Sequence, residues 1–316
     1  MNLPSNKYIH KVISLLIKGG ILILCIYYIL EKLWDVNISL NIKEILPKIN
    51  CEYFYTALVL VFFNWGIEAK KWKFLISKLE YISFSTAIKS ILSGVTISIF
   101  TPNRVGEFAG RIFYLNNTDK IKATLISLIG SLFQLMVTII MGFIACVIYY
   151  QKHKNEAIIF NSISTHNLFY LLVIFAFILI SLIIIYFNDN SISKKIKEII
   201  KTYSTQELSY AFILSLLRYF VFSFQYYLML LTFGVDLGII NAFLLIAITF
   251  LVTSAIPTFA LTEITVRGAS SVFFFSLECG DSLSIISASL ILWIINLGIP
   301  AIVGGAFIWN LKFFKT

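Results

Sequence analysis

Charged side chains are scarce in this chain, because only 13% of its 316 residues are Asp, Glu, Lys or Arg. A soluble protein of this length carries about twice that share, roughly 25%. Hydrophobic residues make up 59% of the sequence and recur in runs long enough to cross a bilayer. The composition excludes an ordinary soluble domain and predicts an all-α polytopic membrane protein, a single integral membrane domain over residues 1–316.

Cysteine and histidine are also rare. The four cysteines are scattered without metal-ligand spacing or a disulfide framework, and the three histidines lie near the N-terminus or in one loop. The phosphate-binding pattern Gly-x-x-x-x-Gly-Lys-Ser/Thr is absent, and the aspartates are isolated. These absences give no support for a catalytic triad, a zinc site or a nucleotide-hydrolysing site. We therefore expect no metal, no cofactor and no enzymatic activity.

Basic residues are in excess, with a formal net charge of +9. This excess does not indicate nucleic acid, because lysines and arginines also collect at the cytoplasmic ends of membrane helices. We expect no nucleic-acid partner.

Long apolar runs predict the membrane spans. The clearest is 168–187, whose twenty residues are almost all Leu, Ile, Phe or Val, about the length needed to cross ~30 Å of hydrocarbon. Five further runs share this character: 19–30, 53–69, 123–150, 209–233 and 283–309. We therefore expect about six full spans. The stretch 68–73, which holds Glu68, three lysines and Trp72, is typical of an anchor at the cytoplasmic interface.

Two other apolar runs, 83–100 and 239–256, end just before a proline, after which a helix restarts. Proline cannot continue a helix but suits its first position. The sequence therefore predicts two broken or re-entrant helix pairs, with structural breaks at Pro102, Gly106 and Pro257. Matched broken helices in the two halves of a chain indicate a binding site near the membrane midplane of an inverted-repeat transporter.

Each break is followed by ionisable residues at helical spacing. Glu107 and Arg111 lie four residues apart, as do Glu263 and Arg267, and Arg104 lies in the first break. Residues four apart share one helix face and can pair. Ionisable groups at membrane depth indicate a functional site, and we take these five as candidate substrate-binding residues. A short cytoplasmic loop with an ordinary intrahelical ion pair is the alternative for the first break.

Polar residues inside the other spans add two candidates. Gln134 lies in 123–150 and Arg218 in 209–233. A single buried glutamine is typical of a hydrogen bond between helices, and we include both residues among the substrate-binding candidates. In 83–100, small and hydroxyl residues fall on one stripe, which favours close packing over a polar path.

Isoleucines and lysines interleave at helical spacing in 191–201. This pattern predicts an amphipathic basic helix on an anionic membrane surface. If each interruption returns to its own side, fifteen lysines face the cytoplasm and five face outward. This bias predicts a multi-pass protein of the cell membrane with both termini cytoplasmic, and broken pairs that open to opposite sides. The half-repeats would cover approximately 1–150 and 151–316.

The residues quoted so far resemble those of a known family. The stretch 70–73 before a serine-rich helix, followed by the block from Thr101 to Glu107, resembles the transmembrane region of the lysylphosphatidylglycerol synthase family, also called the flippase-like domain. The resemblance covers nearly the whole chain. The second half departs from the family pattern, because Phe259–Leu261 replace a glycine-rich turn and Gly268 replaces an acid. Glu263 is expected to supply the missing carboxylate.

The resemblance implies a stand-alone membrane domain that moves lipids, without the soluble domain that carries the synthase activity. We expect a flippase for an anionic phospholipid or a polyprenyl-phosphate lipid, driven downhill, by ions or by the membrane potential. Its partners would be anionic membrane lipids, with a homo-oligomer or a separate lipid-modifying enzyme as further candidates. Two alternatives stay open: a membrane-embedded transferase with Glu107 as general base, and a non-catalytic partner subunit of a lipid- or glycan-modifying enzyme.

Overall fold

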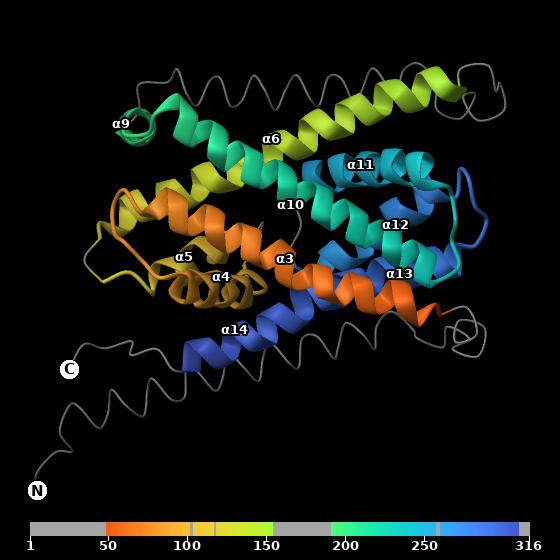
Figure 1. Cartoon of the computed structure of the whole chain (residues 1–316), viewed down its shortest axis with the longest axis horizontal. Helices are drawn as coiled ribbons and strands as arrows, with labels where there is room; N and C mark the ends of the chain where they lie inside the picture. The colour runs from red at the N-terminus through yellow and green to blue at the C-terminus, as the bar shows by residue number, and fades with distance from the viewer. Residues whose placement is uncertain (1–48, 102–103, 117, 154–190, 257–259, 310–316) are drawn as a thin grey trace, which may run out of the picture.

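The structure is a computed structural model that describes residues 49–101, 104–116, 118–153, 191–256 and 260–309. Every regular element in these ranges is a helix (Figure 1). The α-helices are α3 (Cys51–Ile76), α4 (Phe84–Ser98), α5 (Gly106–Ile112), α6 (Lys120–His153), α9 (Ser191–Lys201), α10 (Thr205–Thr232), α11 (Ile239–Ala255), α12 (Ala260–Phe275), α13 (Ser282–Trp293) and α14 (Ile299–Trp309). A π-helical turn, η3 (Ile294–Gly298), joins α13 to α14.

Three of the described helical segments are long and apolar enough to cross a membrane. They are Lys120–His153, Thr205–Thr232 and the continuous segment Ser282–Trp309. A segment of 28 residues spans about 42 Å, more than the ~30 Å of hydrocarbon. The predicted all-helical class is therefore confirmed for the described residues, and the three apolar segments support a multi-pass membrane protein. The predicted spans 19–30 and 168–187 lie outside the described residues.

Two short helical hairpins fill opposite halves of the molecule. The pair α4 and α5 follows the end of α3, whereas the pair α11 and α12 follows the end of α10, which lies at the opposite end (Figure 1). Neither hairpin runs the full length, since each turns back near the middle. The predicted runs 83–100 and 239–256 agree with α4 and α11 to within two residues.

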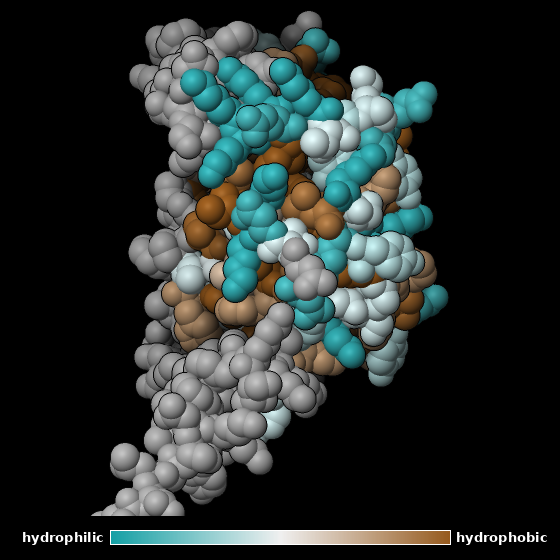
Figure 2. All heavy atoms as spheres, turned by 90° about the vertical axis from the view of Figure 1, so that its left-hand side faces the viewer, coloured by the Kyte–Doolittle hydropathy of each residue, from teal (hydrophilic) through white to brown (hydrophobic). Residues whose placement is uncertain are grey.

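The two ends of the molecule differ in charge. The end where α3 finishes and where α6 and α10 begin carries a hydrophilic surface, which Figure 2 shows facing the viewer. Its exposed lysines include Lys70, Lys78, Lys120, Lys122, Lys194, Lys195 and Lys201. The other end exposes the acidic residues Glu52, Asp236 and Glu278. We call these the basic end and the acidic end.

The predicted interface anchor at 68–73 is wrong for its central residues. Lys71 and Trp72 are each only 1% exposed, and Glu68 is 2% exposed. Helix α3 continues to Ile76, so its inward face includes Glu68, Trp72 and Leu75 at helical spacing. The charges are buried because they pair inside the protein, whereas Lys70 remains exposed.

Small residues on α4 allow the close helix packing that the sequence favoured. A Cβ atom added at Gly110 would lie 2.4 Å from the Cα of Gly94, so α4 and α5 are in backbone contact. The Ser90 hydroxyl donates to the carbonyl of Arg111 at 2.9 Å and accepts from Trp72 Nε1 at 3.2 Å. The stripe therefore packs helices together.

The last span contains an interruption that its apolar sequence did not predict. Pro300 has no N–H to donate to the turn before it, and the helix widens there into η3. Asn296 lies in this turn, and its side-chain amide donates to the Leu292 carbonyl at 3.1 Å and accepts from Asn64 at 2.9 Å. The wide turn thereby turns a buried asparagine toward α3.

Candidate functional site

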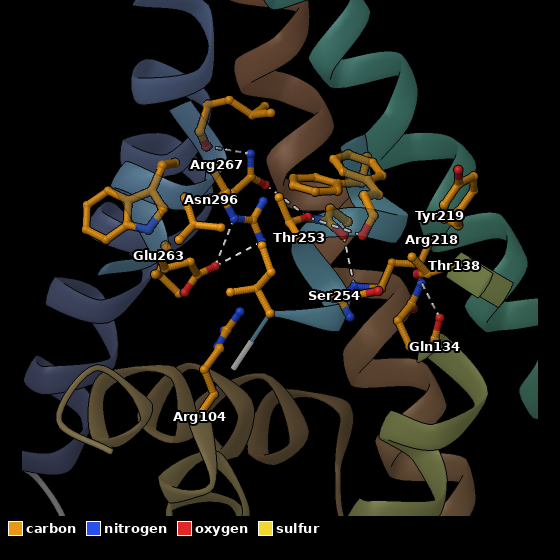
Figure 3. A pocket seen from close by; sticks show the side chains of 18 of the residues that line it. Arg104, Gln134, Thr138, Arg218, Tyr219, Thr253, Ser254, Glu263, Arg267 and Asn296 are labelled. Carbon is orange, nitrogen blue, oxygen red and sulfur yellow. Dashed lines mark hydrogen bonds and ion pairs between the residues drawn. The ribbon is translucent and has the colours of Figure 1, made fainter. Parts of the chain in front are cut away.

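A cavity of about 460 Å³ lies where the two hairpins turn back, between the long helices (Figure 3). Its wall is formed by residues of α3, α6, α10, α11, α12 and the α13–η3 segment, together with Arg104, which precedes α5. Aromatic rings form part of the wall, and its polar residues are Asn64, Arg104, Gln134, Thr138, Arg218, Thr253, Ser254, Glu263, Arg267 and Asn296. The structure thus brings five of the seven predicted binding residues to one cavity.

The first break places Arg104 at the cavity. Arg104 has a φ of 58°, a left-handed conformation rare for a residue other than glycine. The Thr101 hydroxyl accepts a hydrogen bond from the Gly106 N–H at 2.8 Å, and α5 begins only at Gly106. The helix predicted to restart at Pro102 therefore starts later, because the left-handed residue interrupts it. Pro102 itself lies outside the described residues.

Glycine is required at Gly106 by a close approach. A Cβ atom there would lie 2.8 Å from the Ile97 carbonyl oxygen. The start of α5 therefore packs directly against the end of α4, which fixes the turn that carries Arg104.

The second break places Glu263 and Arg267 at the cavity. Helix α11 ends at Ala255 and α12 begins at Ala260, while Pro257 lies outside the described residues. Glu263 Oε1 accepts from Arg267 Nε at 2.9 Å and lies 2.9 Å from its Nη2. The predicted pair at four-residue spacing is confirmed, with Glu263 only 7% exposed.

A third acidic residue, Glu68, organises the charges next to the cavity. One oxygen of its carboxylate lies 2.8 Å from Lys71 Nζ and 3.1 Å from Arg218 Nη1, and the other lies 2.9 Å from Arg111 Nη2. Glu68 was not among the binding residues predicted from the sequence, because the stretch 68–73 was interpreted as an anchor at the membrane interface. The available signal was the spacing of Glu68 and Lys71, which lie three residues apart on one helix face.

The Glu107–Arg111 pair lies behind the cavity wall. Arg111 pairs with Glu107 and Glu68, stacks over Trp72 at 5.6 Å, and is 2% exposed. Neither Glu107 nor Arg111 lines the cavity. Glu107 reaches the site through Arg104, whose Nη2 lies 3.8 Å from its carboxylate. The exposed surface pair considered for the first break is therefore wrong.

Arg218 lines the cavity as predicted and is held from three sides. Its Nε donates to Asn64 Oδ1 at 3.0 Å, its Nη1 to Glu68 at 3.1 Å, and its guanidinium lies 5.2 Å over the Trp65 ring. Asn64 is in turn bonded to Asn296. This arrangement orients the arginine without neutralising it completely, because Glu68 is shared with two other cations.

Gln134 also lines the cavity, but the hydrogen bond predicted between helices is not found within the described ranges. Its side-chain Oε1 is buried without a partner among the described residues. The glutamine on α6 therefore presents an unused acceptor at the site.

The chain's four arginines all lie at this site, three on the cavity wall and Arg111 behind it. Apart from Lys71, the lysines whose exposure is described lie at or near the surface. Arginine suits buried ion pairs and bidentate contact with phosphate, whereas lysine is more strongly hydrated. The different positions of arginine and lysine along the chain could already be seen in the sequence.

The site carries an excess of positive charge. Within the described residues, the cavity and the network behind it hold Lys71 and four arginines against three glutamates, which leaves two positive charges. No group of three His, Cys, Asp or Glu side chains in the described ranges could hold a metal ion. The arrangement can hold an anionic group among planar guanidinium donors.

The sequence of the chain matches a known protein family. The family described as the lysylphosphatidylglycerol synthase TM region matches residues 15–304. No curated protein and no solved structure is significantly similar to the chain. The match spans both hairpins and every residue of the cavity wall, and the chain belongs to the lysylphosphatidylglycerol synthase TM region family.

Proposed function

We propose that this protein is a flippase that moves an anionic phospholipid or polyprenyl-phosphate lipid across the cell membrane. The observation that carries the proposal is that Arg104, Arg218 and Arg267 line one cavity, with Glu263 as the only acid on the described wall. The planar guanidinium of an arginine can donate two parallel hydrogen bonds to the oxygens of a lipid phosphate, and a low-dielectric site strengthens each contact.

The position of the cavity supports movement of a head group from one leaflet to the other. It lies where the hairpin from the basic end and the hairpin from the acidic end turn back. We propose that the hairpins belong to two halves related as an inverted repeat among six full spans. Rocking of one half against the other would then open the arginines to each side in turn.

The charge asymmetry of the molecule supports an orientation for this movement. The basic end would face the cytoplasm, in keeping with the preference of lysine for that side. Helix α9 begins and ends at the predicted residues, with Ile199 6% exposed and Lys194 and Lys195 exposed. Its lysines would bind the anionic cytoplasmic leaflet.

Reconstitution tests the proposal. Purified protein in liposomes is expected to accelerate the translocation of an acyl-labelled anionic lipid more than that of labelled phosphatidylcholine. Arg267→Gln should reduce anionic translocation by about tenfold or more, because one charge-assisted hydrogen bond contributes ~1.5–3 kcal/mol. Lys122→Gln, which removes an exposed charge at the basic end, is the matched control. Translocation equal to that of protein-free liposomes would refute the flippase.

A further inference from the structure

The cavity wall contains polar groups that a phosphate alone does not satisfy. Two acceptors on the wall, Glu263 Oε2 and Gln134 Oε1, are buried without a hydrogen-bond partner in the described part of the chain. Glu263 is 7% exposed, and in Figure 3 it lies on the opposite side of the view from Gln134. A phosphate diester offers no donor, so it cannot bond to either oxygen.

Other groups on the same wall also lack partners in the described ranges, among them the Tyr219 hydroxyl and Arg104 Nε. The indole N–H groups of Trp65 and Trp293 are buried without partners in the described ranges, and the two residues are 7% and 4% exposed. Buried polar groups in native proteins are nearly always bonded. Phosphate oxygens could accept from the indoles, whereas Glu263 and Gln134 need a donor that a phosphate diester lacks. A phosphate-bearing occupant would therefore need a further group that donates.

A hydroxyl group meets this requirement, because it donates and accepts at once. An ammonium group also donates and could serve Glu263 and Gln134, while the phosphate oxygens of the same lipid accept from the indoles, so hydrogen bonding does not separate the two groups. The charge balance distinguishes the hydroxyl from the ammonium. The site already has two more cations than carboxylates, and an ammonium would add a further positive charge in a low-dielectric space.

Resting on the proposed lipid flippase, we propose that the site selects a head group that combines a phosphate with neutral hydroxyls, such as a glycerol or a sugar. The phosphate binds among Arg104, Arg218 and Arg267, while hydroxyls donate to Glu263 and Gln134 and accept from Trp65 and Trp293. The volume of about 460 Å³ lies in the range of small-ligand sites, ~300–1,000 Å³, so it suits a head group while the acyl chains stay in lipid.

The test compares three lipids with identical labelled acyl chains in proteoliposomes. Phosphatidylglycerol carries the phosphate and two hydroxyls, phosphatidylmethanol carries the same charge without a hydroxyl, and phosphatidylethanolamine carries an ammonium. Phosphatidylglycerol is expected to cross at least about fivefold faster than phosphatidylmethanol, since leaving a buried polar group unsatisfied costs ~1–3 kcal/mol, and also faster than phosphatidylethanolamine. Equal rates for the first two lipids, or a faster phosphatidylethanolamine, overturn the inference but leave a flippase.

Two variants connect the preference to named residues. Gln134→Leu removes an acceptor, and Trp293→Phe removes an N–H while keeping a ring. Each should lower the ratio of phosphatidylglycerol to phosphatidylmethanol rates severalfold. Gln225→Leu alters a buried amide of α10 that bonds to the Ala57 carbonyl and does not line the cavity, so its ratio should match the wild type. A ratio that survives in both cavity variants contradicts the assignment.

Binding in detergent separates this inference from the proposed function. If no lipid is translocated, the flippase proposal fails, and titration of the intrinsic tryptophan fluorescence with the same lipids still tests the head-group preference. Tighter binding of phosphatidylglycerol than of phosphatidylmethanol supports the inference, and equal binding overturns it.

Discussion

Glu68 is a single buried carboxylate that contacts three cations, Lys71, Arg111 and Arg218. Ion pairs exposed to water contribute little to stability. Glu68 is only 2% exposed, however, and removing one member of a buried ion pair leaves the other charge uncompensated. Arg218 keeps its place on the cavity wall through Glu68 and Asn64. The acid therefore acts on the site by positioning an arginine.

Removal of this carboxylate should destabilise the protein. Glu68→Leu leaves three cations without their shared partner, and breaking a buried pair costs about 3–5 kcal/mol. A loss of about 1 kcal/mol in the free energy of unfolding lowers the Tm of a domain of similar size by ~2–4 °C. We therefore expect the Tm in detergent to fall by roughly 10 °C. Glu52→Gln, an exposed acid in the first turn of the same helix, serves as the control and should change the Tm little. A wild-type Tm for Glu68→Leu would contradict the positioning role.

Arg111 and Arg267 should respond differently to replacement by lysine. Arg111 bridges two carboxylates at 2% exposure, whereas the side chain of Arg267 is 28% exposed at the cavity. Lysine keeps the charge but lacks the planar fork. We expect Arg111→Lys to lower the Tm, and Arg267→Lys to keep the Tm but reduce anionic lipid translocation.

Thermal unfolding and proteoliposome translocation, measured on both lysine variants, check this division. Arg111→Lys with unchanged Tm and abolished translocation would instead make Arg111 part of the binding site.

At the scale of elements, the hairpin of α4 and α5 depends on backbone contact. The contact of Gly94 with Gly110 brings the two helices together, and Gly106 starts the second helix against the first. This packing fixes the position of Arg104 on the cavity wall. A residue with a side chain at either contact would separate the helices.

Gly110→Ala should destabilise this hairpin. The added Cβ would lie 2.4 Å from Gly94 Cα, and overpacking of this kind costs about 1–3 kcal/mol. Gly66→Ala is the matched control, because nothing lies within 4 Å of a Cβ there. Alanine at this helical position should be neutral or stabilising by up to about 1 kcal/mol. Thermal unfolding of both variants decides, and equal Tm values would contradict the tight contact.

At the scale of the whole molecule, the difference in charge between the ends orients the protein. The two hairpins start from opposite ends of the molecule. The orientation of the protein in the membrane therefore decides which of the two helix breaks lies nearer the cytoplasmic leaflet. Lysines gather at one end, where α9 lies, and Cys51 is exposed at the other.

Labelling from the two sides of the membrane should separate these ends. In a background with Cys25, Cys146 and Cys279 replaced by serine, Cys51 should react with a membrane-impermeant maleimide added outside. With Cys51 also replaced, Lys195→Cys should react only from the cytoplasmic side. Labelling of both from the same side would contradict the orientation.

The sequence by itself determined the class of protein and much of its helical framework. Periodicity placed α9 at its observed bounds and α11 within one residue, because hydrophobic spacing and breaker residues act locally. The pairs Glu107–Arg111 and Glu263–Arg267 were readable for the same reason, since residues four apart on a helix are neighbours.

Only the tertiary structure decided which of these charges meet in a cavity. Glu68 contacts Arg111 and Arg218, which are 43 and 150 residues away in the chain, and no local pattern records such contacts. Burial turned a stretch typical of a membrane interface into the centre of an ion-pair network, because α3 continued past the expected end and packed its charged face inward. The folded arrangement likewise placed Arg104 at the cavity and Arg111 behind it. Two arginines seven residues apart in one motif thus have different surroundings. Arg111 contacts α3 and its own helix, whereas the cavity that Arg104 lines is formed largely by helices from the other half of the chain.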